Sequence, residues 1–298
     1  MRFKKVCIGC FILIALITID CSFHHAKGSE FSLSSISEMT LSSAPLDLAA
    51  SPSDPWIFIL VKGEIQIFST DENKVIKRFP IDISFDQMAY SGKSDSLILS
   101  SRTSQKLKII RIDEIHPITT NDLAFLGNEN AKVTIAVFSQ YMCPHCARIQ
   151  PLIDQLLNRY QDKIKIVFKN YPFSDDDNNI AFKASVAAQA ARKQNKFFEC
   201  HHALHAAEKP LTDEKIETIA KELKLDMDQF HKDILNTELK QLIRRDRAEG
   251  QMAGITGVPT FMVNNKLVKR EGLGLFEMID LEIEQLPEKS QTNQKGNK

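Results

Sequence analysis

The chain has 298 residues, and its 38 basic and 38 acidic side chains give a formal net charge of zero. This length is enough for two domains, and an apolar content of 43% is enough for a sizeable core. A balanced charge without a long basic stripe argues against nucleic acid as a partner.

The N-terminus is typical of an export signal. Residues 1–5 are positively charged, and residues 6–19 form an apolar run. That run fits a signal peptide better than a membrane span, which needs about 20 residues. The cleavage site is poor, because Ala26 supplies one small residue but the bulky His24 stands where a second is usual. Residues 1–27 are therefore predicted to be a signal peptide or a retained membrane anchor, and the protein to be periplasmic or otherwise extracytoplasmic.

Six cysteines are present, three of them in or beside the export segment. The other three are Cys143, Cys146 and Cys200. One close pair and one single cysteine do not make a disulfide-rich framework. Export places the pair in an oxidising compartment, where a disulfide can persist. Cys200 is expected to be a buried, inert thiol.

After a serine-rich linker, residues 45–118 are predicted to form a small all-β repeat module. The β-rich runs are Trp56–Val61, Glu64–Phe68 and Lys106–Ile112. The pattern that begins at Leu48 returns 40 residues later at Met88, and a period near 40 is typical of propeller blades. The module resembles YVTN-type β-propellers, but a closed propeller needs roughly four blades. It is either a small open sheet or one whose edges are covered by copies from other subunits, and a small β module without a ligand is the favoured interpretation.

The pattern changes at Ala131 to alternating strands and helices. We expect a buried strand at Lys132–Ser139, a helix at Cys143–Tyr160 and a second strand at Lys163–Lys169. Two strands around a helix predict a parallel βαβ unit. Pro151 lies inside the expected helix and should kink it.

The remaining elements are predicted from capping signals and apolar periodicity. Residues 113–130 are expected to be a connector without a strand. The expected elements are helices across residues 178–236, with Thr212 capping one of them, a charged helix at Thr237–Ala253, a hairpin of Thr260–Val263 and Leu267–Lys269 around Asn264-Asn265, and a closing helix at Leu275–Leu286. Residues 287–298 are expected to be a flexible tail.

The pair Cys143-Pro144-His145-Cys146 carries the chemistry. It follows a strand and a turn, so Cys143 should lie at a helix N-terminus, where free N–H groups lower the pKa of its thiol. Cys146 lies one turn further on and should be more buried, placed to attack a mixed disulfide on Cys143. His145 adds a donor or a positive charge. The spacing alone is shared by redox centres, structural disulfides and metal sites.

Three stretches carry a family resemblance. Residues 133–173, with the Cys143–Cys146 motif, resemble a DsbA-like thiol–disulfide oxidoreductase of the thioredoxin superfamily, down to the proline at position 151. Gly254–Phe261 resembles the cis-proline loop of that family. Lys196–Leu204 is similar to the aromatic-rich helix of its helical insertion.

The resemblance implies an α/β thioredoxin fold over residues 120–286, with a helical insertion at about 178–250. It implies Cys143 as the nucleophile and Cys146 as the resolving thiol, with His145 as a redox tuner. Val258, Pro259 and Thr260 would form the substrate-binding loop, with a cis Val258–Pro259 bond facing the pair. No cofactor is implied.

The sequence departs from the family at one position. Relatives commonly hold a buried acidic residue six positions before the first cysteine, and here that position is Val137. The nearest polar residue, Gln140, cannot take a proton. Proton transfer from Cys146 is therefore expected to use water or another group.

We expect an exported thiol–disulfide oxidoreductase that acts on protein cysteines, with a dithiol oxidase as the favoured direction. Its partners would be cysteine-containing exported proteins and a membrane or soluble redox partner that recycles the pair. A reductase or isomerase that forms a homodimer through residues 45–118 is one alternative. A metal-binding chaperone is the other, with His145, His201, His202 and His205 joining the thiols. A solvated helix face is the preferred interpretation of the last three histidines, so no metal is expected.

Overall fold

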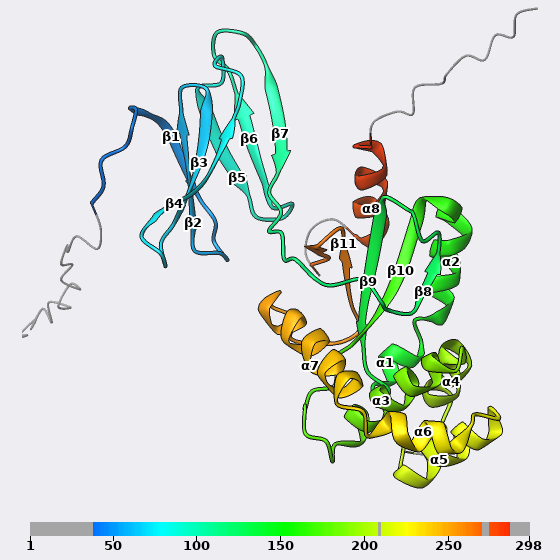
Figure 1. Cartoon of the computed structure of the whole chain (residues 1–298). Coiled ribbons are helices and arrows are strands. Elements are labelled where there is room, and N and C mark those ends of the chain that lie inside the picture. The colour runs from blue at the N-terminus through cyan, green and yellow to red at the C-terminus, as the bar shows by residue number, and fades with distance from the viewer. Residues whose placement is uncertain (1–37, 208–209, 270–273, 287–298) are drawn as a thin grey trace, which may run out of the picture. The chain divides into compact units, whose positions relative to one another are not determined.

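The computed structural model describes residues 38–207, 210–269 and 274–286. The predicted export segment and the predicted tail lie outside the described residues. Small antiparallel sheets come first in the chain, and an α/β domain follows (Figure 1). Among the residues described, no helix is long and apolar enough to cross a membrane.

The N-terminal β region consists of two antiparallel sheets. The first holds β1 (Pro45–Ala50), β2 (Trp56–Val61), β3 (Glu64–Ser69) and β4 (Lys74–Pro80) in sequential order. The second holds β5 (Gln87–Ser91), β6 (Ser96–Ser100) and β7 (Leu107–Arg111). The two repeat units predicted from the sequence thus correspond to one sheet each, and β4 has no counterpart in the second.

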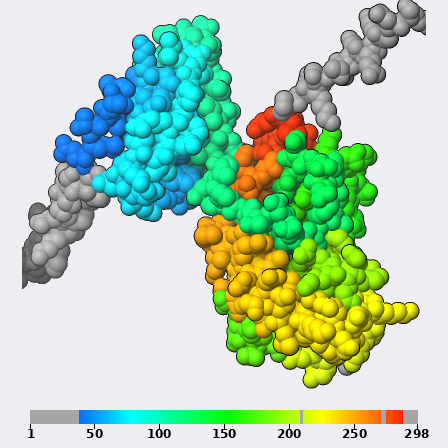
Figure 2. Space-filling view, viewed as in Figure 1, coloured from blue at the N-terminus to red at the C-terminus, as the bar shows by residue number. Residues whose placement is uncertain are grey.

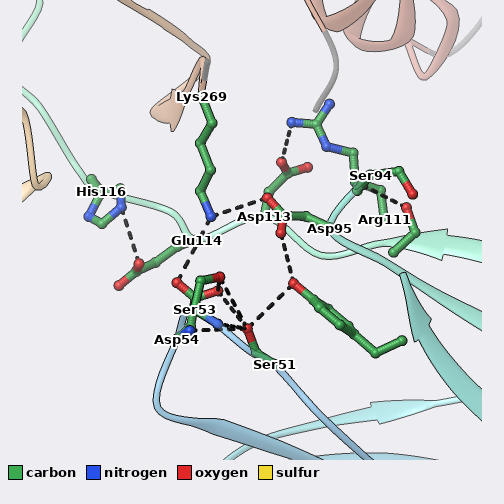
Figure 3. Close-up of polar contacts among 12 residues, drawn as sticks. Ser51, Ser53, Asp54, Ser94, Asp95, Arg111, Asp113, Glu114, His116 and Lys269 are labelled. Atoms are coloured by element: carbon green, nitrogen blue, oxygen red, sulfur yellow. Dashed lines mark hydrogen bonds and ion pairs between the residues drawn. The ribbon is translucent and has the colours of Figure 1, made fainter. Parts of the chain in front are cut away.

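Contacts between the two repeat units fix them as one module. An Asp47 carboxylate oxygen accepts a 2.7 Å hydrogen bond from the backbone N–H of Met88. The Tyr90 ring stacks on Phe58 with the ring centroids 5.5 Å apart. Within the second unit, Asp95, labelled in Figure 3, accepts a 2.7 Å hydrogen bond from the Tyr90 hydroxyl. The shared apolar core contains Phe58, Leu60, Ile65, Ile67, Phe85, Met88, Leu97 and Leu99.

The α/β domain is built on a five-stranded sheet with the order β12-β11-β9-β10-β8. Its strands are β8 (Phe125–Gly127), β9 (Val133–Ser139), β10 (Ile164–Asn170), β11 (Thr260–Val263) and β12 (Lys266–Leu267). β9 and β10 are parallel, as the predicted βαβ unit requires, and the other pairings are antiparallel. The predicted α/β thioredoxin-like fold with a helical insertion is confirmed. The connector expected at residues 113–130 is wrong in one respect, since it contains β8.

Alternate residues of β9 serve two different cores, as the two-residue period of a strand requires. Val133, Ile135 and Val137 face a core that includes α2 (Gln150–Tyr160), α3 (Ile180–Lys193) and α8 (Leu275–Glu284). Ala136 and Phe138 face the other core, next to α7 (Thr237–Met252). Because both faces are covered, the strand is apolar along nearly its whole length.

The helical insertion lies where β9 ends. It comprises α3, α4 (Phe197–His205), α5 (Asp213–Glu222) and α6 (Met227–Ile234). In Figure 1 these helices gather at the end of the sheet where β9 runs into α1 (Pro144–Ala147). In Figure 2 they form the yellow-green to yellow body next to the green surface of the α/β domain.

The helix predicted at Cys143–Tyr160 is in fact two helices. α1 ends at Ala147 and α2 begins at Gln150, so the break precedes Pro151 and Pro151 does not kink a continuous helix. Proline is tolerated in a first helical turn, where its missing N–H is not needed. The break leaves α1 as a single short turn that carries the cysteine pair.

Candidate active site

The two cysteines differ sharply in their surroundings. Cys143 is the N-cap of α1, with an extended backbone at φ −97° and ψ 115°, and is partly exposed. Cys146 lies inside α1 and is only 2% exposed. Pro144 occupies the first turn of α1, where it fixes a helical φ without losing a hydrogen bond. Both cysteines are free thiols.

The pKa of the Cys146 thiol is raised to about 12, mainly because the thiol is buried; the Gln140 backbone lowers it and the neighbouring Cys143 thiol adds to the rise. Cys146 is thus a protonated thiol at neutral pH. When the disulfide bond to Cys146 breaks, the sulfur must gain a proton, and when that bond forms, the thiol must lose one.

The loop from Gly254 to Thr260 brings a second part of the chain to the pair. The Val258–Pro259 peptide bond is cis, as predicted. The Cys143 thiol donates a 3.5 Å hydrogen bond to the Val258 carbonyl oxygen. Thr260 closes the loop, because its hydroxyl donates a 2.7 Å hydrogen bond to the Gly257 carbonyl oxygen. The three residues expected to bind substrate are therefore beside Cys143 and partly exposed.

His145 is exposed at the surface of α1. Its Nδ1 atom lies 2.9 Å from a guanidinium nitrogen of Arg148. The imidazole therefore faces Arg148, one turn further along the chain.

The expected solvated face at His201, His202 and His205 is wrong for two of the three. His202 is exposed, but His201 is buried and His205 is mostly covered. The Tyr141 hydroxyl lies 3.1 Å from His201 Nδ1. Phe197 lies four residues before His201, on the same helix face, and this spacing was the signal in the sequence that the histidine points inward.

Burial, with a smaller contribution from the neighbouring histidines, lowers the pKa of His201 to about 3 and that of His205 to about 4. Both imidazoles are therefore neutral at physiological pH. Within the described residues, no group of three or more His, Cys, Asp or Glu side chains is placed to hold a metal ion.

A buried ion cluster behind the loop was not expected from the sequence. Lys169 Nζ lies 2.6 Å from Asp246 Oδ1 and 2.6 Å from Glu249 Oε2. Thr119 donates to Glu249 from both its backbone N–H and its hydroxyl. Burial raises the pKa of Asp246, whereas Glu249 keeps a lowered pKa despite its burial because Lys169 and Thr119 donate to it. The sequence signal was a lysine at the end of an apolar strand.

Two hollows flank the cysteine pair. One, of about 270 Å³, is lined by Cys146, by apolar side chains of α2 and β10, and by the three histidines of α4. The other, of about 380 Å³, lies beside Cys143 and is lined mostly by apolar side chains, among them Met142, Leu204 and Leu211. A partly exposed thiol, a buried thiol and a cis-proline loop thus meet next to an apolar hollow.

This fold and this site define the class of thioredoxin-fold thiol–disulfide oxidoreductases. The chain belongs to the thioredoxin family, since the family model described as "Thioredoxin" matches residues 119–278. The match covers the sheet, the helical insertion and the cysteine pair, and it leaves the N-terminal β module outside.

Several proteins are similar to this domain. A probable disulfide bond formation protein D of Bacillus anthracis is 28% identical over 168 residues, which cover 53% of this chain and 77% of that protein. A Na(+)/H(+) antiporter NhaA 3 of Salinispora tropica is 28% identical over 155 residues, which cover 52% of this chain but only 24% of the antiporter. Among solved structures, the thiol-disulfide exchange protein alpha-DsbA2 from Wolbachia pipientis is 28% identical, with a TM-score of 0.47, and the match covers 56% of this chain and 88% of that one.

Proposed function

We propose that this protein is an exported dithiol oxidase, which transfers a disulfide from Cys143 and Cys146 to the cysteines of other exported proteins. The observation that carries the proposal is the contrast within the pair. Cys143 is partly exposed beside the Val258 carbonyl, while Cys146 is buried in the same short helix. One sulfur is open to attack, and the other is hidden from a second substrate.

The oxidase reaction takes two steps. A substrate thiolate attacks Cys143 Sγ in the oxidised pair, the Cys143–Cys146 bond breaks, and Cys146 departs with the electron pair and gains a proton. A second thiolate of the substrate then attacks the substrate sulfur that is bonded to Cys143 in the mixed disulfide. The substrate disulfide forms, Cys143 leaves as a thiolate, and two electrons have passed from the substrate to the pair.

The loop and α1 supply orientation. The Val258 backbone lies within hydrogen-bond reach of Cys143, so Val258, Pro259 and Thr260 would align a substrate chain with the reactive sulfur. Pro144 fixes the turn that presents Cys143. His145 would stabilise the thiolate form of Cys143, and in this role it competes with its contact to Arg148.

The cellular setting is part of the proposal. Residues 1–27 would direct the chain to the periplasm or another extracytoplasmic compartment, with residues 6–19 as a cleaved signal or a retained anchor. The oxidised pair would be regenerated by a membrane or soluble redox partner. No nucleic acid and no cofactor take part. The name of the Bacillus anthracis relative, probable disulfide bond formation protein D, supports the same direction of reaction.

A second candidate is a reductase or isomerase that dimerises through residues 45–118. One observation favours it: Leu107 and Ile109 on the edge strand β7 are 69% and 65% exposed. An apolar edge strand is a ready surface for pairing with another chain. In this proposal the module is a pair of propeller-like blades whose edges a second copy covers.

The deciding experiment is the equilibrium redox potential of the pair, titrated in glutathione buffers. A potential near roughly −120 mV, as in DsbA, supports disulfide donation, whereas a potential near about −270 mV, as in thioredoxin, supports reduction. A pair that does not titrate would contradict both candidates.

A further inference from the structure

Cys146 faces the cavity of about 270 Å³ that α4 closes from the other side. Apart from Cys146 itself, the titratable side chains in its lining are His201, His202 and His205. A space of this size holds several water molecules, each of which occupies about 30 Å³ in the liquid. The buried thiol therefore shares one small chamber with three imidazoles.

Because the side chain at position 137 cannot exchange a proton with Cys146, the groups that line this chamber become important. Val137 is fully buried and cannot exchange a proton. Gln140 is buried as well and carries an amide, which is no acid or base at neutral pH. The proton that Cys146 gains or loses must therefore use other groups.

The imidazoles form a connected cluster with Tyr141. The Tyr141 hydroxyl lies 3.1 Å from His201 Nδ1. The rings of His201 and His205 are 4.6 Å apart, and those of Tyr141 and His205 are 4.7 Å apart. His205 Nδ1 is buried and has no protein hydrogen-bond partner among the described residues. One ring nitrogen of the cluster is thus left without a structural role.

We propose that His201 and His205, with Tyr141, form a neutral proton relay between Cys146 and solvent. The proposal rests on the dithiol exchange proposed above and assigns the group that takes the place of the missing acidic residue. His202, exposed on the same helix, lies at the solvent end of the chamber.

The relay works because its imidazoles stay uncharged. A neutral imidazole has one N–H donor and one acceptor nitrogen. When the Cys143–Cys146 bond breaks, Cys146 departs with the electron pair. An imidazole N–H gives its proton to the sulfur, and the other ring nitrogen takes one from water or from Tyr141, which is replenished from solvent. The ring ends neutral, and the proton has come from solvent.

The other groups that face the cluster are compatible with this role. Burial raises the pKa of Tyr141 well above its ordinary value and that of Cys200 to about 12, so both remain protonated. Phe168 and Phe197 supply the rest of the packing around His201. Glu199, on the same helix, acts on Cys200 and His202 through its charge and is exposed, paired with Lys196.

The test measures how fast the Cys143–Cys146 disulfide of the full chain opens on mixing with dithiothreitol, by rapid quench, alkylation and mass spectrometry. His205→Phe and His201→Phe keep a ring of similar size but remove the exchangeable nitrogens. We expect opening at pH 7 to slow by about 100-fold, the low end of what a positioned acid–base group contributes. Added imidazole buffer should restore the rate in proportion to its concentration.

Controls separate the relay from a structural role. His231 is exposed on α6 and contacts Glu217, so His231→Phe should open at the wild-type rate and ignore imidazole. If His201→Phe fails to fold, His205→Phe decides. Wild-type rates in these variants, or slow rates that imidazole does not restore, would overturn the relay alone. A wild-type chain that forms no Cys143–Cys146 disulfide would instead overturn the proposed function.

Discussion

The Tyr171 hydroxyl donates a 2.6 Å hydrogen bond to the Ile255 carbonyl oxygen. Tyr171 directly follows β10, and Ile255 lies between the end of α7 and the Val258–Pro259 bond. The bond therefore ties the sheet to the loop that approaches Cys143.

Replacing Tyr171 with Phe should destabilise the fold and disturb the loop. The buried Ile255 carbonyl would lose its partner, at a cost of about 1–3 kcal/mol in the free energy of unfolding. Urea unfolding measures the lost free energy of unfolding. The rate of disulfide exchange with a cysteine-containing peptide measures how far the loop is disturbed. Tyr160→Phe is the matched control, because Tyr160 donates to the Phe276 carbonyl, on another helix. Equal peptide exchange rates in the two variants would contradict a role for Tyr171 in placing the loop.

Gly250 should tolerate no side chain. A Cβ at this position of α7 would lie 2.5 Å from Tyr171 Cε2 and 3.1 Å from Phe138 Cε1. Gly250→Ala should cost about 1–3 kcal/mol, as overpacking of a core does. Thermal unfolding checks this, with Gly257→Ala as the control, because nothing lies within 4 Å of a Cβ there. Equal melting temperatures would refute the close packing of α7 on the sheet.

Lys169→Met should be among the most destabilising substitutions. It leaves the carboxylates of Asp246 and Glu249 buried without their cation, and breaking a buried pair costs about 3–5 kcal/mol. Adding Asp246→Asn and Glu249→Gln should recover much of the loss, since no uncompensated charge remains. Lys196→Met, in an exposed pair with Glu199, should change stability by less than about 1 kcal/mol. Chemical denaturation of these three variants and the wild type decides the point.

Stability should fall as the pH drops below about 6.5, the ordinary pKa of histidine. The folded pKa values of His201 and His205 are lowered to about 3 and about 4, so the unfolded chain binds more protons between these values and 6.5. Stability is complete above that window and is lost through it, by up to about 1.4 kcal/mol per pH unit for each histidine. His201→Phe should make the dependence shallower, and an unchanged slope between pH 4 and 6.5 would contradict the burial of this imidazole.

Cys143→Ser and Cys146→Ser should fail in different ways. Without Cys143 no mixed disulfide forms. Without Cys146 the mixed disulfide forms on Cys143 but cannot be resolved within the chain, so it accumulates. Non-reducing gels after incubation with oxidised glutathione and a cysteine peptide show the difference. Cys200→Ser should behave as wild type. A mixed disulfide that accumulates on Cys200 in the other variants would contradict the assignment of an inert, buried thiol.

Much of the α/β domain followed from local patterns. β9 and β10 were predictable because strands covered on both faces are apolar at successive positions. Thr212 was predictable as an N-cap, and its hydroxyl does accept from the Lys215 N–H at 3.2 Å. Asn264 and Asn265, both with positive φ, form the turn of the predicted hairpin, although its second strand is Lys266–Leu267. β8 was missed because a strand of three residues is too short to show a period.

The candidate site also has parts that were expected from short stretches of sequence and parts that were not. The Cys143–Cys146 motif is contiguous in sequence and was visible directly, and the Val258–Pro259 loop was expected from its resemblance to the cis-proline loop of the family. The burial of His201 and the Lys169–Asp246–Glu249 cluster depend on residues separated by up to 80 positions. Histidine, lysine and carboxylates are exposed in most folds, so only the packing of α4 and α7 could show that these are not.

The sequence by itself determined the Cys143–Cys146 motif, most of the strands and helices of the α/β domain and the two repeat units of the β module, and the family resemblance added the cis-proline loop. Apolar periodicity and capping residues encode these elements in short stretches of neighbouring residues. Only the tertiary structure decided that His201 and His205 are covered in the hollow that Cys146 lines and that the loop is tied to the end of β10 through Tyr171. Burial and pKa depend on what distant segments bring to a side chain, and that information exists only once the chain has folded.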